Sequence, residues 1–149
     1  MKRSKIYQAF TKMFTLIILC ITASGFTTKL GLDSFEIFLN NKLILKQTVN
    51  QPLSLRKLEL AKAKESDQLL IKYTHCMIKG AGTNRSMVLR DENGHTLKKW
   101  TFANTTGSDL RMTISVKELM QLKNIHSDHQ LSLYYVAREL PKGEVLAFL

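Results

Sequence analysis

The sequence predicts an antiparallel β-sandwich, and three observations indicate this fold. Short stretches with apolar residues at alternate positions recur along the chain, and this period of two is typical of strands that bury one face. Turn-forming pairs such as Asn40-Asn41 and Asn93-Gly94 separate these stretches. At most one stretch has the character of a short helix, near residues 116–123. We therefore predict an all-β domain with an immunoglobulin-like or jelly-roll-like outline.

The first 25 residues differ from the rest of the chain. Four basic residues precede an apolar run over residues 13–21, and small residues follow at 23–25, which is the order found in a secretory signal peptide. The run is shorter than the roughly 20 residues that span a bilayer. We therefore predict cleavage after Gly25, with an uncleaved anchor as the alternative. Lipid attachment at Cys20 is disfavoured because the bulky Leu19 precedes it.

Cleavage would leave residues 26–149 as a single domain that is periplasmic or secreted and has no stable membrane span. The signal segment holds four basic residues and no acid, so 18 basic residues remain against 12 acids, a net charge of +6. This excess is typical of a solvated surface and also suits anionic partners. Because export argues against nucleic acid, we expect an envelope or surface protein or a glycan as partner.

The first half of this domain predicts a hairpin, a broken strand and a loop. Apolar residues alternate through residues 33–49 on both sides of Asn40-Asn41, which tolerate the positive φ of a tight turn. In residues 51–60 the leucines change from odd to even positions, which indicates a bulge or a break between two short strands. Residues 61–67 are polar and predict a loop.

The second half predicts further strands and the helix. Residues 67–76 predict a strand in which His75 continues the face of Tyr73 and Cys76 falls on the opposite face. Ser115 and Glu118 fit a capping box that opens the helix. The other expected elements are a hairpin over 86–102, strands over 110–116 and 130–139, a turn over 139–144 and a final strand over 145–149.

Several of these stretches together resemble a known class of protein. They are FEIFLNNKLILKQ, QPLSL, YTHC, LRDENGHTLKKWTF and LSLYYVARELPKGEVLAFL. This combination is similar to small exported β-sandwich proteins of unassigned function from Bacteroidota. The resemblance implies export and a compact β domain, and it implies no activity or cofactor.

The run of residues 73–77 contains the candidate metal site. His75, Cys76 and Met77 are ligand types that suit copper(I), and Cys with His suits zinc. Adjacent strand residues point to opposite faces, so a shared ion requires the strand to end there. His95 is a candidate further ligand. The alternative is a half-buried cysteine beside a surface histidine, with no cofactor.

Cys76 would be the single cysteine of the mature domain. It could therefore form a disulfide-linked dimer, or act as a nucleophile activated by a histidine. The sequence offers no third catalytic group and no oxyanion donors, so we expect no enzymatic activity. The candidate binding residues are Tyr73, Lys79 and Arg85, which combine positive charge with an aromatic ring. We therefore favour a non-catalytic exported protein that binds a partner, with periplasmic metal handling or redox chemistry as the alternative.

Overall fold

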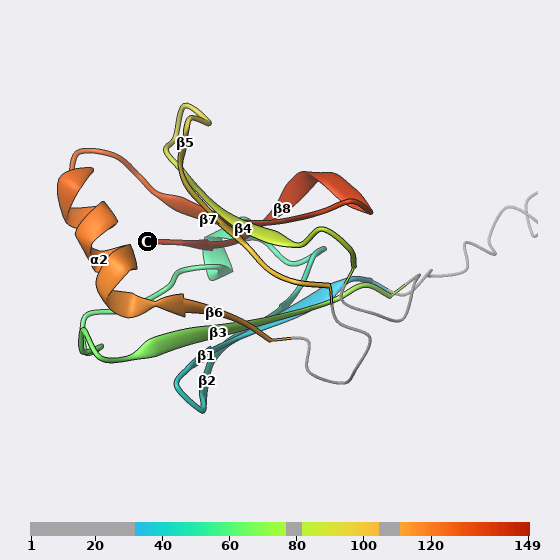
Figure 1. Ribbon diagram of the computed structural model, residues 1–149, viewed down its shortest axis with the longest axis horizontal. Helices are drawn as coiled ribbons and strands as arrows, with labels where there is room; N and C mark the ends of the chain where they lie inside the picture. Colours follow the sequence, from blue (N-terminus) through green and yellow to red (C-terminus); the bar gives the residue numbers. More distant parts are fainter. Residues whose placement is uncertain (1–31, 77–81, 105–110) are drawn as a thin grey trace, which may run out of the picture. The chain divides into compact units, whose positions relative to one another are not determined.

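The computed structural model describes residues 32–76, 82–104 and 111–149 (Figure 1). These residues form eight strands, one α-helix and one short 3-10 turn. The predicted signal segment and its cleavage after Gly25 lie outside the described residues. Within the described part, no helix is long and apolar enough to cross a membrane.

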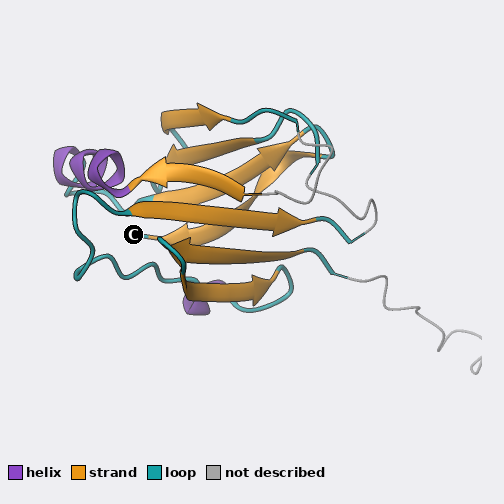
Figure 2. Cartoon of the chain, turned by 60° about the horizontal axis from the view of Figure 1, so that its bottom comes forward, coloured by secondary structure: helices purple, strands orange, loops and turns teal. Residues whose placement is uncertain are grey.

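The strands form two antiparallel sheets of four, with the orders β2-β1-β3-β6 and β5-β4-β7-β8. Figures 1 and 2 show the sheets as two layers, with α2 at one end. The predicted β-sandwich is therefore confirmed. The strands are β1 (Ser34–Leu39), β2 (Lys42–Thr48), β3 (Gln68–Thr74), β4 (Ser86–Arg90), β5 (Thr96–Thr101), β6 (Arg111–Ser115), β7 (Ser132–Ala137) and β8 (Leu140–Phe148).

The hydrophobic core lies between the sheets, as the alternation predicts. Leu69, Ile71 and Tyr73 of β3 are buried, whereas the residues between them are half-buried. Tyr135 of β7 approaches from the other sheet, and its ring stacks on that of Tyr73 with the centroids 4.1 Å apart. Each such buried side chain contributes about 1.5–3 kcal/mol relative to an exposed one.

Both predicted hairpins are confirmed. Asn40 adopts a φ of 54° between β1 and β2, and Gly94 adopts a φ of 83° between β4 and β5. Residues without a Cβ, or with a short polar side chain, reach this left-handed region at little cost. The turn chemistry therefore sets the pairing of these strands.

Residues 49–60, here called the crossover segment, differ from the prediction of two short strands. Residues Leu53–Leu55 form a 3-10 turn, and the chain then runs beside the end of β8. The Phe148 N–H donates to the Arg56 carbonyl at 2.7 Å, and the Leu58 N–H donates to the Phe148 carbonyl at 2.8 Å. The change of leucine parity marks the point where the segment passes from exposed Leu53 and Leu55 to buried residues.

The predicted turn over residues 139–144 is also wrong. The turn lies at Arg138 and Glu139, and β8 already begins at Leu140. Tyr135 pairs with Glu144 and Ala137 pairs with Leu140, so β8 carries extra residues between these pairs. Gly143, with a φ of 77°, provides the left-handed residue that this bulge contains.

The helix α2 (Val116–Ile125) begins where the sequence predicts, but the capping box does not form. The Ser115 side chain makes no capping hydrogen bond. Glu118 instead accepts a hydrogen bond from Trp100 Nε1 at 2.8 Å and pairs with Lys98 Nζ at 2.7 Å. The interactions with Lys98 and Trp100 lower the pKa of the Glu118 carboxyl. The carboxylate thus fastens α2 to β5.

Candidate functional site

His75 lies in a buried polar cluster directly after β3, and we call Asp33, Tyr73, His75 and Tyr135 the His75 cluster. The His75 side chain is only 6% exposed. Its Nδ1 lies 3.0 Å from Asp33 Oδ2, and its Nε2 lies 3.1 Å from the Tyr135 hydroxyl. The Tyr73 hydroxyl donates to the same Asp33 oxygen at 3.0 Å. Both ring nitrogens of His75 are therefore engaged within the protein.

The cluster places a carboxylate, an imidazole and a hydroxyl in the order found in a catalytic triad. Two properties of the Tyr135 hydroxyl argue against a role as nucleophile. Tyr135 is fully buried between the sheets. Burial is also the main reason why the pKa of Tyr135 is raised, as is that of Tyr73. The two phenols stay protonated at neutral pH, and the Tyr73 hydroxyl donates to Asp33. The cluster therefore joins the two sheets.

His75 is buried and Cys76 is exposed, which is the reverse of what we expected. The alternative to a metal site was a half-buried cysteine beside a surface histidine, whereas the Cys76 side chain is exposed and free. The Cys76 N–H donates to Asp33 Oδ1 at 2.8 Å. Asp33 and Tyr135 supply polar partners for His75 in the interior, which makes its burial favourable.

The other predicted metal ligands are not brought together in the described residues. Met77 lies outside them. His95 sits in the β4–β5 turn, with its Nδ1 2.9 Å from Asp91 Oδ2. Across the described part of the chain, no group of three or more His, Cys, Asp and Glu side chains is arranged to hold a metal ion.

Two of the three predicted binding residues lie in the interior, and the third, Lys79, falls outside the described residues. Tyr73 and Arg85 are each 1% exposed. One terminal nitrogen of Arg85 donates to the Ala103 carbonyl at 2.8 Å. Arg85 lies directly before β4, and its positive charge is typical of an exposed side chain, so no local pattern in the sequence predicts its burial.

Gly82 belongs beside the His75 cluster and was not singled out from the sequence. It has a φ of 77°, and an added Cβ would lie 2.8 Å from both His75 Nε2 and the Tyr135 hydroxyl. The same Cβ would lie 3.0 Å from Glu139 Oε2. Glu139 in turn accepts hydrogen bonds from the backbone and hydroxyl of Thr83, both at 2.8 Å. The glycine-rich run before Arg85 is the sequence signal that marks this close approach.

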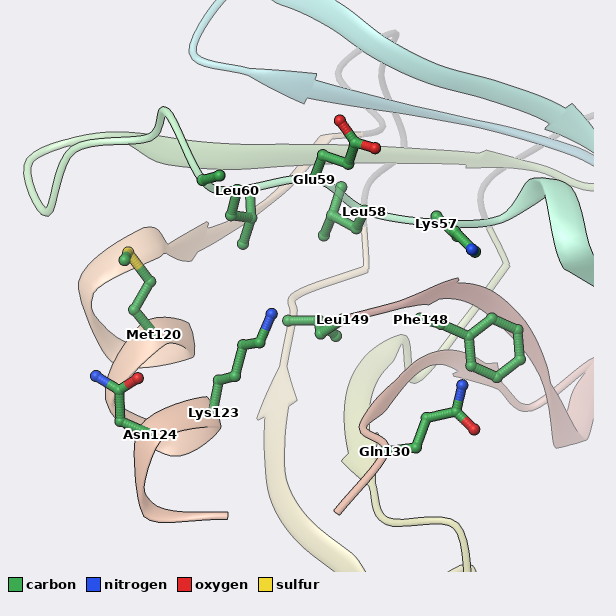
Figure 3. Close-up of a pocket in the computed structure, with 11 residues that line it drawn as sticks. Lys57, Leu58, Glu59, Leu60, Met120, Lys123, Asn124, Gln130, Phe148 and Leu149 are labelled. Atoms are coloured by element: carbon green, nitrogen blue, oxygen red, sulfur yellow. The ribbon is translucent and has the colours of Figure 1, made fainter. Parts of the chain in front are cut away.

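A cleft of about 530 Å³ opens near the start of β3 and β7, which is the other end of these strands (Figure 3). This volume lies within the range of ligand pockets. The crossover segment, α2 and the end of β8 form its walls. Its apolar lining residues are Leu58, Leu60, Ala61, Met120, Phe148 and Leu149, and its polar ones are Lys57, Glu59, Lys123, Asn124 and Gln130.

Two lysines give the cleft its charge. Lys57 comes from the crossover segment and Lys123 from α2, and both are exposed. Neither forms an ion pair with any described residue. In Figure 3 the Lys123 side chain extends towards Leu60 and Leu149, whereas the Glu59 carboxylate points away from Lys123. The cleft therefore presents, beside apolar surface, two lysines without an ion pair among the described residues.

Two smaller hollows adjoin this cleft at Lys57. One of about 380 Å³ lies against Leu43 of β2, and one of about 250 Å³ lies against Leu53. Lys57 lines all three. Among the described residues, Leu43, Leu53 and Leu55 are three of the five exposed large hydrophobic residues. We call the surface of the three hollows, together with Leu55, the cleft surface.

Arg56 holds the crossover segment in place behind the cleft surface. Its side chain is 1% exposed, and its guanidinium donates to the Val49 carbonyl at 2.8 Å and to the Val145 carbonyl. It also forms an ion pair with Glu144 at 2.5 Å. These bonds join the segment to β8, so the cleft wall is built on a buried anchor.

No protein-family model, curated protein or solved structure matches this chain. The candidate site is therefore defined by its geometry alone: a largely apolar cleft at one end of a β-sandwich, with two lysines that pair with no acid in the described part of the chain. The His75 cluster, at the other end of β3 and β7, has its polar groups satisfied internally.

Proposed function

We propose that this chain is an exported β-sandwich protein that acts by binding a partner and carries out no catalysis. The partner is an envelope or surface protein or a glycan, and it is bound at the cleft surface. The observation that carries this proposal is the meeting of three hollows at Lys57, bordered by exposed leucines. The predicted signal peptide supports the location.

The energetics of the cleft surface favour association. Contiguous exposed apolar side chains mark interaction sites on soluble domains, and covering one leucine contributes about 1.5–3 kcal/mol. Leu43, Leu53 and Leu55 are each about half exposed. Lys57 and Lys123 would attract an acidic partner, which increases the association rate more than the affinity.

Site-specific photo-crosslinking in intact cells tests this proposal. A benzoyl-phenylalanine residue replaces Leu53 on the cleft surface and, as a matched control, Thr113, an exposed residue on β6. We expect a discrete adduct from position 53 and none from position 113, and Lys57→Glu should weaken the adduct. The absence of an adduct at 53, or identical adducts from both positions, would contradict partner binding at this surface.

The exposed thiol of Cys76 keeps the metal-handling or redox alternative open to test. In that function His75, Cys76 and Met77, with His95 as a further ligand, would bind copper or zinc. His75 would first have to release Asp33 or Tyr135, which makes this the less favoured proposal. Titration with copper(I) and zinc against a competing chelator, beside Cys76→Ser, decides it. Stoichiometric binding that the substitution abolishes would establish the alternative and displace the binding proposal.

A further inference from the structure

The interior of the cleft offers hydrocarbon contacts. Leu58 and Leu60 are 5% and 7% exposed and come from the crossover segment, and half-buried Met120 faces them from α2. The methionine thioether is flexible and adapts to irregular apolar ligands. Leu149 adds a further apolar side chain (Figure 3). A linear hydrocarbon chain would therefore find apolar contacts on both walls.

The rim of the cleft offers positive charge on two sides. Lys57 and Lys123 lie on the opposed walls formed by the crossover segment and α2. In Figure 3 the Lys123 side chain extends towards Leu60 and Leu149, whereas the Lys57 side chain is directed away from Lys123. An anionic head group at Lys123 would accept charge-assisted hydrogen bonds, which are stronger than neutral ones. Glu59, the one described lining residue with a carboxylate side chain, is directed away from Lys123 (Figure 3). The charge pattern therefore matches a single anionic group at one end of the ligand.

The polar lining inside the cleft suits a sugar less well than an apolar ligand. Apart from the charged side chains, only Asn124 and Gln130 present side-chain hydrogen-bonding groups, and Phe148 is the one aromatic lining residue. Ligand sites achieve specificity through polar groups that converge on the ligand, and a sugar would require one for most of its hydroxyls. An apolar ligand with one anionic end fits this lining better.

We infer that the cleft binds an amphipathic carboxylate with a single unbranched hydrocarbon chain, that is, a fatty-acid-like ligand. The carboxylate would lie at Lys123, and the chain would lie along Leu58, Leu60 and Met120. This inference rests on the proposed binding function, because it uses the same surface, and it specifies the chemistry of what is bound.

Isothermal titration calorimetry on the purified protein tests the inference with octanoate, decanoate and dodecanoate at concentrations where each is monomeric. We expect saturable one-to-one binding and an affinity that increases about fourfold for each added methylene until the cleft is full. A cationic amphiphile of the same chain length, dodecyltrimethylammonium, should bind at least about tenfold more weakly than dodecanoate because the lysines repel it. Equal affinity for the two head groups would overturn the inference.

Matched variants on α2 locate the site. Lys123→Gln should weaken decanoate binding about tenfold, whereas Lys117→Gln, on the same helix but outside the cleft, should leave it unchanged. Met120→Gln should weaken binding several-fold, whereas Ile125→Gln, at a residue that is 73% exposed, should not. Equal effects within either pair would overturn the assignment of the cleft, because each pair compares two residues of the same helix.

Two further outcomes separate this inference from its alternatives. Vesicles of anionic phospholipid that bind the protein while monomeric decanoate does not would identify a membrane-binding face and overturn the inference. The photo-crosslinking from position 53 reports on a macromolecular partner independently of calorimetry. Decanoate binding without a crosslink would retain the ligand and reject the macromolecular partner, and a crosslink without decanoate binding would do the reverse.

Discussion

The two ends of the sandwich use the same strands for opposite purposes. At the end of β3 the His75 cluster buries polar groups and pairs them with one another. At the start of β3 and β7 the cleft surface leaves leucines exposed and lysines without an ion-pair partner among the described residues. The histidine and tyrosine side chains of the His75 cluster are therefore buried and hydrogen-bonded within the protein, whereas the leucines and lysines of the cleft surface are exposed to solvent.

This difference indicates what distinguishes a structural cluster from a binding site. It is whether the side chains have hydrogen-bond or ion-pair partners within the protein, more than their chemical type. A buried polar group is stable only when it is paired, and the His75 cluster meets that requirement within the protein. An exposed leucine and a lysine without an ion pair can be buried or paired only when another molecule binds to them. The predictions below test whether each end behaves accordingly.

The largest expected effect concerns the anchor behind the cleft surface. Arg56→Ala should lower the free energy of unfolding by about 3–5 kcal/mol, because it leaves Glu144 and two carbonyls without their buried partner. Urea denaturation followed by circular dichroism measures this change. A loss below about 1 kcal/mol would mean that the crossover segment is not held by Arg56.

The next largest effect concerns the packing of Gly82 against the His75 cluster. Gly82→Ala should cost about 3 kcal/mol of unfolding free energy, because the new Cβ meets His75 and Tyr135 in addition to the strain of a positive φ. Gly94→Ala is the matched control: its φ is 83°, and an added Cβ meets no atom within 4 Å. We expect it to cost about 1 kcal/mol. Equal losses in the two variants would show that the His75 cluster does not pack closely against Gly82.

A pH-dependent effect is expected beside the cleft. His129 Nδ1 lies 2.8 Å from Glu92 Oε1, and this interaction raises the pKa of His129. A raised histidine pKa means that the contribution to stability is fully present below the ordinary value of about 6.5 and is lost as the pH rises through the raised value. In an NMR titration, Glu92→Gln should move the His129 pKa back towards its ordinary value. Glu65→Gln, which removes a carboxylate that pairs with Lys117, should leave the titration unchanged.

The smallest effect concerns the thiol. Cys76→Ser should change the free energy of unfolding by less than about 0.5 kcal/mol, because the side chain is exposed and its backbone N–H still donates to Asp33. Native protein should also react with a thiol reagent such as iodoacetamide without prior unfolding. Protection of the thiol in the native state would contradict this placement.

The sequence predicts most of the fold because the fold depends on local patterns. Alternation in β3 and the turns at Asn40 and Gly94 correctly predict strands and hairpins, whereas the burial of His75 differs from the surface histidine that we expected. The β8 start is missed because Pro141 and Gly143 resemble a turn, whereas here they form part of an edge strand that contains a bulge. The crossover segment is missed because its leucines change from exposed to buried without a regular period.

The sites depend on contacts that no local pattern encodes. His75 is paired with Asp33, 42 residues away, and with Tyr135, 60 residues away. Lys57 and Lys123 line one cleft only because the crossover segment and α2 enclose the same space. For this reason the sequence directed attention to His75 and Cys76, and the cleft emerged only from the assembled chain.

The most direct test of the central claim, that the cleft end binds and the His75 end is structural, is NMR mapping of the purified, ¹⁵N-labelled protein titrated with decanoate. We predict saturable shift changes for the backbone amides of Lys57, Leu58, Lys123 and Asn124, and none for Tyr73 or His75. Shift changes centred on His75 and Cys76, or no saturable changes at the cleft, would contradict the account.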